Sequence, residues 1–150
     1  MDKRIFAVFT CSLLALTLHS QTSLNKLYLD FAHESNVSKV TLSGLAMMLA
    51  RPFMDETDSK ISSIRALSFD ECTQDVKDRF NNSALHFKDD RYELFVNSNE
   101  KDEKVRIFFK FQDNMIREMV IMTMGDSPAL IHLKGKIKPS DIENLSNGRK

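Results

Sequence analysis

From Tyr92 onward, apolar and polar residues begin to alternate with a period of two, and this pattern restricts the fold more than any other feature. Such alternation is typical of strands that bury one face. It predicts strands at residues 92–96 and 105–112. A nearly continuous apolar run predicts another strand at 115–124, and a last strand follows the turn signal at 125–128, over residues 129–137. Asp113-Asn114 suits a two-residue hairpin, because both residue types tolerate positive φ. Strands joined by short turns pair antiparallel, so the sequence predicts a four-stranded meander.

The N-terminal half mixes helical and strand patterns. Apolar residues at helical spacing predict helices at 23–34, with Ser23 as N-cap, and at 73–84, and residues 61–69 predict a strand with neighbours on both sides. The other predicted elements are a strand at 37–42, a helix from Ser43 to Pro52 and a helix at 141–145 capped by Ser140. Because helices come early and strands late, we predict an α+β fold: a two-layer sandwich with a mixed sheet, a C-terminal antiparallel meander and helices mainly on one face.

The first 20 residues have the pattern of a secretory signal peptide. A short basic head precedes an almost wholly apolar run at 5–18, and residues 18–20 suit a peptidase that cuts before Gln21. The apolar run is shorter than the roughly 20 residues that span a bilayer. We therefore predict a signal peptide at 1–20 that engages the membrane transiently, a single α+β domain at 21–150, and a periplasmic or secreted product.

Charge and cysteine content narrow the function classes. The 21 basic and 21 acidic residues balance, and loss of Asp2, Lys3 and Arg4 with the leader leaves 20 of the acidic and 19 of the basic ones. The basic residues form no stripe in the sequence that would neutralise a phosphate backbone, so nucleic acid is not an expected partner. Cys72 is the single cysteine after the leader, so no intramolecular disulfide is expected. Its acidic neighbours should raise the pKa of the thiol, which argues against a reactive thiolate.

No residue pattern predicts a catalytic centre, a metal site or a bound cofactor. His33, His86 and His132 do not stand at metal-ligand spacing from another histidine, cysteine or carboxylate. No nucleophile elbow is present to mark a serine hydrolase. Closely spaced methionines such as Met119 and Met122 could hold Cu(I), but these two residues of one strand point to opposite faces, so core packing is the better interpretation.

Aromatic and methionine side chains make a partner-binding surface the favoured functional prediction. Residues 108–111 place phenylalanines on both faces of one strand, so helices should cover one face while the other is either covered or exposed. An exposed patch built from residues such as Phe108 or Met119 would bind an envelope protein or another ligand. The alternative is an enzyme, or a carrier of a small ligand or metal, whose site forms only in three dimensions, for example with His86 or His132 beside a carboxylate.

Several short segments, in a fixed order, resemble a known family. They are the helix at 24–31 and the segments SGLAMML (43–49), ISSIRAL (61–67), IHLKGKI (131–137) and DIENL (141–145). Together with the leader they are similar to a family of small exported bacterial proteins described as domain of unknown function 4252. The resemblance implies a periplasmic or envelope location in Gram-negative bacteria. It implies no established activity and carries no functional residues over to this chain.

Overall fold

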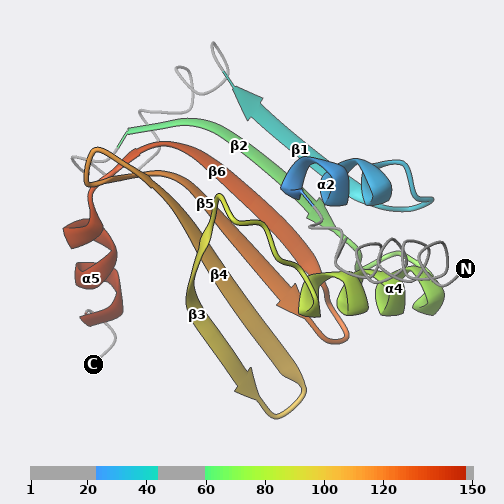
Figure 1. Cartoon of the computed structure of the whole chain (residues 1–150). Coiled ribbons are helices and arrows are strands. Elements are labelled where there is room, and N and C mark those ends of the chain that lie inside the picture. The colour runs from blue at the N-terminus through green and yellow to red at the C-terminus, as the bar shows by residue number, and fades with distance from the viewer. Residues whose placement is uncertain (1–22, 44–59, 148–150) are drawn as a thin grey trace, which may run out of the picture.

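The computed structural model describes residues 23–43 and 60–147 (Figure 1). Its elements, in chain order, are helix α2 (Leu24–Ala32), strands β1 (Ser38–Ser43) and β2 (Lys60–Ser68), helix α4 (Gln74–Leu85), strands β3 (Glu93–Glu100), β4 (Glu103–Gln112), β5 (Met115–Met124) and β6 (Ala129–Ile137), and helix α5 (Pro139–Asn147). The predicted leader and the predicted helix between Ser43 and Pro52 lie outside the described residues. The other predicted helices and strands are confirmed, although β3 extends four residues beyond its predicted end. The cap predicted at Ser140 is wrong, because α5 already begins at Pro139 and Ser140 lies inside it.

The six strands form one sheet in the order β1-β2-β6-β5-β4-β3. Strands β3 to β6 follow one another as the predicted meander. The sheet is not mixed as predicted, because every neighbouring pair of described strands is antiparallel. The crossover through α4 explains the difference. It carries the chain from β2 to β3 at the far edge of the sheet, so β2 pairs with the last strand, β6, and not with the next one.

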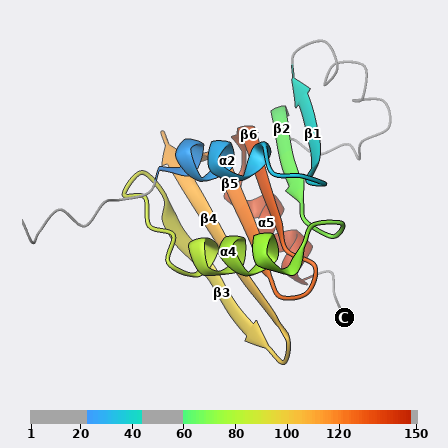
Figure 2. The ribbon, with the colours of Figure 1, turned by 90° about the vertical axis from the view of Figure 1, so that its right-hand side faces the viewer.

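Helices α2 and α4 lie on one face of the sheet, and α5 lies on the other (Figures 1 and 2). The N-cap predicted at Ser23 is confirmed, since its side chain accepts a hydrogen bond from the third backbone amide along the chain. Thr73 caps α4 in the same way. None of the described helices is long and apolar enough to cross a bilayer.

Arg106 of β4 fixes the C-terminal end of α4 to the sheet. Its Nη1 donates to the carbonyl oxygens of Ala84, Leu85 and Phe87 at 2.7, 3.0 and 3.2 Å. The last carbonyls of a helix have no partner within the helix, and a cation there also interacts favourably with the helix dipole. Arg106 is therefore a charged residue on the helix-bearing face of β4 whose role is structural.

The main core lies between the sheet and helices α2 and α4, and an aromatic group stands at its centre. Phe31 comes from α2, Phe69 follows β2, and Phe80 comes from α4; all three are buried. The rings of Phe69 and Phe80 stack with centroids 4.3 Å apart, and Phe31 meets both edge-on. A second, smaller cluster under α5 includes Phe109 and Ile116. The two clusters place apolar packing on both faces of the sheet.

The turn between β4 and β5 is the predicted two-residue hairpin. Asp113 and Asn114 have φ values of 54° and 60°. Positive φ at both central positions is what a type I′ turn requires. The turn places Gln112 directly opposite Met115 and so sets where the pairing of β4 with β5 begins.

Candidate functional site

The sheet face opposite α2 and α4 carries a continuous row of aliphatic side chains, one from each strand. The register places each member directly opposite the next, and side chains in such positions pack together. We call this set the open row; in sheet order it consists of Val40, Ala66, Ile131, Ile121, Ile107 and Val96. Val40 at the sheet edge is exposed, and the other five side chains are half-buried.

A second row lies beside the open row on the same face, and we call the two rows together the open face. The second row consists of Leu42, Ile64, Leu133, Met119 and Phe109. Among the described helices only α5 lies on this side, next to the Phe109 end (Figure 2). Five inter-strand spacings of about 4.8 Å make the open row about 24 Å long, and two rows cover on the order of 300 Å². The largest apolar patch of a monomeric protein commonly measures about 300–600 Å² and is often functional, so the open face is a candidate binding surface.

The two residues predicted to bind a partner lie on opposite faces of the sheet. Phe108 is 4% exposed and meets Phe87 edge-on in the main core, so its predicted place at the surface is wrong. The reason is its parity in β4, since it points toward the helices while Ile107 and Phe109 point away. Met119 is half-buried in the second row, and its role in binding stays a prediction.

A buried polar cluster occupies the helix-bearing face, centred on the carboxylate of Glu118 in β5. The Tyr92 hydroxyl donates to Oε2 of Glu118, and Nε2 of His132 in β6 lies 2.7 Å from the same oxygen. Lys110 of β4 places its Nζ 3.1 Å from the other oxygen, Oε1. A buried charge needs donors of this kind to replace lost water, and here three of them serve one carboxylate.

Arg65 of β2 determines which nitrogen of His132 carries the proton. Arginine only donates, so its Nη2, 3.0 Å from Nδ1 of His132, makes Nδ1 an acceptor. The proton therefore sits on Nε2 and is donated to Glu118. Burial is the main cause that lowers the pKa of His132; the carboxylate opposes it, and the positive charges of Arg65 and Lys134 lower the pKa further. The imidazole is thus neutral at pH 7.

The same contacts hold Glu118 in its charged form. Burial alone would raise the pKa of Glu118, but hydrogen bonds from Tyr92, His132 and Lys110 outweigh it and lower the pKa to about 2. The pKa of Tyr92 is raised, first by burial and then by its hydrogen bond to the carboxylate. At pH 7 the cluster therefore combines a charged Glu118 with a neutral Tyr92 and a neutral His132.

A histidine beside a carboxylate is the arrangement that the enzyme alternative needs, but this one is closed to a substrate. His132 is 3% exposed, and both ring nitrogens are engaged. A surface pocket of about 260 Å³ lies elsewhere, between α4 and the turn after β3, and its lining includes Asn81 and Lys101. The polar cluster has a structural role. It connects β2, β4, β5 and β6 to Tyr92, just before β3.

One comparison with known proteins finds a match. The family model described as Domain of unknown function (DUF4252) matches residues 30–145. That stretch is most of the chain and contains the whole described sheet. The chain belongs to the DUF4252 family. No curated protein and no solved structure gave a match. The open face and the polar cluster both lie within the part of this DUF4252 chain that the family model covers.

The other two histidines in the described part of this DUF4252 chain lie at helix ends. Nδ1 of His33 lies 3.3 Å from the carbonyl oxygen of Leu29, and Nδ1 of His86 lies 2.9 Å from that of Asn82. Each histidine follows the last residue of its helix. In the part of the chain that the structure describes, no three histidine, cysteine or acidic side chains are grouped so as to hold a metal ion.

Cys72 is a buried thiol next to the end of β2. Its Sγ lies 3.5 Å from the carbonyl oxygen of Ser35. The predicted direction of its pKa is confirmed, but the main cause differs: burial raises the pKa most, and the acidic Glu34 and Asp70 add to the rise while Lys77 opposes it. A thiol held protonated in this way is a poor nucleophile.

Proposed function

We propose that this DUF4252 chain is an exported, non-catalytic binding module of the bacterial envelope, and that its open face binds an apolar surface of a partner protein. The observation that carries the proposal is the open row, in which all six strands contribute an aliphatic side chain and no polar one interrupts the series. Export is supported by the signal-peptide pattern at 1–20. The absence of catalysis is supported by a polar cluster that is closed to substrate.

The layers of the fold support the proposal that an apolar partner covers the open face. A sheet with an apolar face normally buries it against another layer of structure. Helices α2 and α4 form that layer on one face, whereas among the described residues only α5 covers the other, and only at one end. At about 25 cal/mol per Å², burial of each 100 Å² of exposed apolar surface would contribute about 2.5 kcal/mol before the costs of association. A partner surface would thus complete the sandwich.

The size of the open face also bears on the strength of binding. Stable complexes bury about 800 Å² on each partner. The two rows cover on the order of 300 Å², which is well below that area. We therefore expect a transient complex, in which the partner exchanges and the free module remains folded and soluble between encounters.

Ile121→Lys should strongly reduce the binding of a hydrophobic dye to the native protein. Ile121 stands in the middle of the open row, between Ile131 and Ile107. A charge at that point interrupts the open row. The long lysine side chain can extend its ammonium group to water, which limits the loss in the free energy of unfolding. The measurement is the fluorescence of anilinonaphthalene sulfonate with folded protein, and we expect the enhancement to fall several-fold.

Leu29→Lys is the matched control, because it introduces the same charge at an apolar residue on the other face. Leu29 lies on α2 and is 50% exposed. Its replacement should leave the dye fluorescence close to that of the wild type. Equal losses in the two variants, or no fluorescence enhancement with the wild-type protein, would contradict the assignment of the open face.

A further inference from the structure

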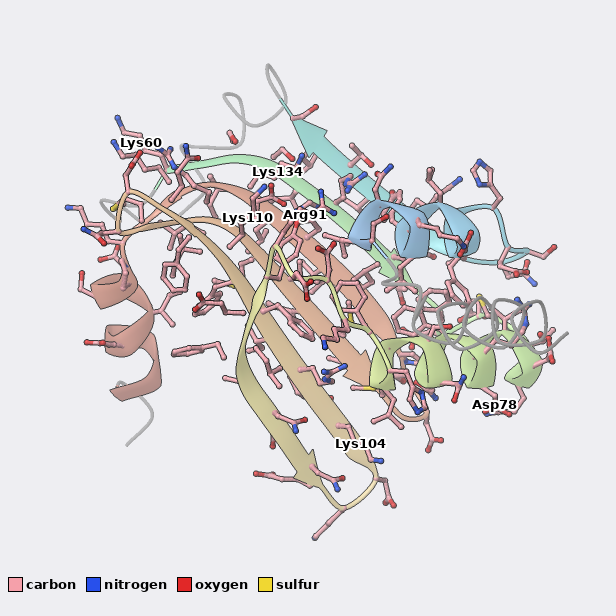
Figure 3. The ribbon with its side chains drawn as sticks, viewed as in Figure 1. Lys60, Asp78, Arg91, Lys104, Lys110 and Lys134 are labelled. Carbon is pink, nitrogen blue, oxygen red and sulfur yellow. The ribbon has the colours of Figure 1, made fainter. Side chains whose placement is uncertain are left out.

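Three lysines gather where β2 begins and β6 ends, on the helix-bearing face. Lys60 lies directly opposite Lys136 in the antiparallel pair. Lys134 precedes Lys136 by two residues, and alternate residues of a strand share a face. We call Lys60, Lys134 and Lys136 the lysine cluster. All three side chains are exposed (Figure 3 labels Lys60 and Lys134).

This arrangement is electrostatically unfavourable by itself. Like charges directly opposite each other in a sheet are destabilising. Within the described residues none of the three lysines forms a salt bridge. Glu118 faces Lys134 across the β5–β6 pair, but its carboxylate already serves Tyr92, His132 and Lys110. The fold therefore brings three positive charges together, and none of them is paired in a salt bridge in the part that the structure describes.

The backbone holds the lysine cluster in a defined geometry. A β-bulge interrupts the register between Ile61 and Ser63. A Cβ atom on Gly135 would lie 2.1 Å from the carbonyl oxygen of Lys60, so only glycine allows the two strands this close approach. The hydroxyl of Ser62 also donates to the carbonyl oxygen of Lys134 at 3.2 Å. Bulges are enriched beside functional sites, where they redirect side chains.

More positive charge lies behind the lysine cluster on the same face. Arg65 contacts His132, Lys110 contacts Glu118, and Figure 3 shows Lys110 and Lys134 in the same region of the sheet. Arg91 is nearby as well, but Asp89 pairs with it at 2.7 Å. Among these cations, Lys110 and Arg91 are paired with carboxylates, whereas no described carboxylate forms a salt bridge with a member of the lysine cluster.

We propose that the lysine cluster binds the phosphate headgroups of an anionic lipid membrane. Lysine is a flexible point charge, whereas recognition of one carboxylate or phosphate in a fixed geometry favours the planar fork of arginine. The cluster is exposed, which suits an extended array of negative charges better than a single enclosed ion. A membrane surface offers such an array, and each lysine near it adds about fivefold to the affinity.

The membrane site and the open face lie on opposite sides of the sheet, so the two assignments are independent. A domain held at the membrane through the lysine cluster would keep the open face directed away from the lipid. Loss of membrane binding would leave the proposed protein partner untouched, and the reverse also holds.

The test compares two triple variants of the full chain that remove the same charge. The first is Lys60→Gln, Lys134→Gln and Lys136→Gln; the second, a matched control, is Lys39→Gln, Lys101→Gln and Lys104→Gln. The control lysines are also exposed and lie away from the cluster (Figure 3 shows Lys104 at the far end of the sheet). Cosedimentation is measured with vesicles of phosphatidylglycerol and phosphatidylcholine, and with vesicles of phosphatidylcholine alone. The neutral vesicles measure any binding to lipid that the apolar leader causes.

The expected result is salt-sensitive binding of the wild type to the anionic vesicles, above that to neutral ones. The lysine-cluster variant should bind about 100-fold more weakly, and the control variant should lose less than about threefold. Equal losses in both variants, or equal binding to the two vesicle types, would overturn the proposal. So would tight binding of inorganic phosphate by the wild type in calorimetry without binding to anionic vesicles, since it would indicate a free anion as the ligand.

Discussion

Phe80→Ala should lower the free energy of unfolding by about 4 kcal/mol, the largest effect we expect from a single substitution in this chain. Phe80 is fully buried and stacks on Phe69 while meeting the edge of Phe31. These three rings join α2, α4 and the end of β2, so the cavity left by truncation opens at the junction of both helices with the sheet. Few neighbouring atoms can move in to fill it, and the loss therefore exceeds the simple transfer free energy of the ring.

Chemical denaturation followed by circular dichroism measures the effect. Leu85→Ala is the control on the same helix, because Leu85 is 45% exposed and leaves no cavity. Its loss should stay below about 1 kcal/mol. Equal losses in the free energy of unfolding from the two substitutions would contradict the described packing of α4 on the sheet.

Glu118→Gln should lower the free energy of unfolding by about 3 kcal/mol at pH 7. The amide keeps the shape of the side chain but removes the charge that Tyr92, His132 and Lys110 share. It also turns an NH₂ group toward donors, which leaves at least one buried polar group without a partner. Removal of one member of a buried charged network costs on the order of 3–5 kcal/mol, and the isosteric amide belongs at the low end of that range.

The same variant should change the response of stability to acid. The pKa of Glu118 falls from 4.5 to about 2 on folding, so its stabilisation is complete above pH 4.5 and is lost as the pH falls toward 2. The pKa of His132 is also lowered from 6.5 in the fold, so the unfolded chain takes up its proton first and stability starts to decline below pH 6.5. Glu118→Gln should remove much of the pH dependence of the free energy of unfolding below pH 4.5. The pH dependence between 4.5 and 6.5 should remain.

Glu93→Gln is the matched control for this experiment, since Glu93 is exposed on β3. Its stability curve against pH should follow that of the wild type closely. A Glu118→Gln protein as stable as the wild type at pH 7, with the same acid slope, would show that the polar cluster does not stabilise the fold.

Local signals predicted the elements of this fold because they act over a few residues. The cap at Ser23 and the positive φ of Asp113 and Asn114 are properties of short segments, and the structure confirms each of them. Alternation over 105–112 likewise found β4. Sheet order is different, since nothing within residues 61–69 states whether β3 or β6 lies beside β2. That choice depends on where α4 delivers the chain, and the predicted mixed sheet was wrong for this reason.

Register explains what the sequence could not predict about the sites. Glu118 and His132 each interrupt an apolar strand, and a polar residue in such a place signals a buried partner. Their partners Tyr92 and Arg65 come from distant segments, so only the register identifies them. The open row was missed for a similar reason. Arg106 lies on the helix-bearing face because it serves the end of α4, and this leaves the more apolar parity of β4 on the open side.

Site-specific photo-crosslinking in the producing cells tests the central claim, that the open face is a protein-binding surface, most directly. A photoreactive amino acid replaces Ile121 in the open row, and in a second strain it replaces Leu29 on α2. We predict a discrete protein adduct from position 121 that disappears when Ile131→Lys is added, and none of that size from position 29. An adduct from position 29 with none from position 121 would contradict the account.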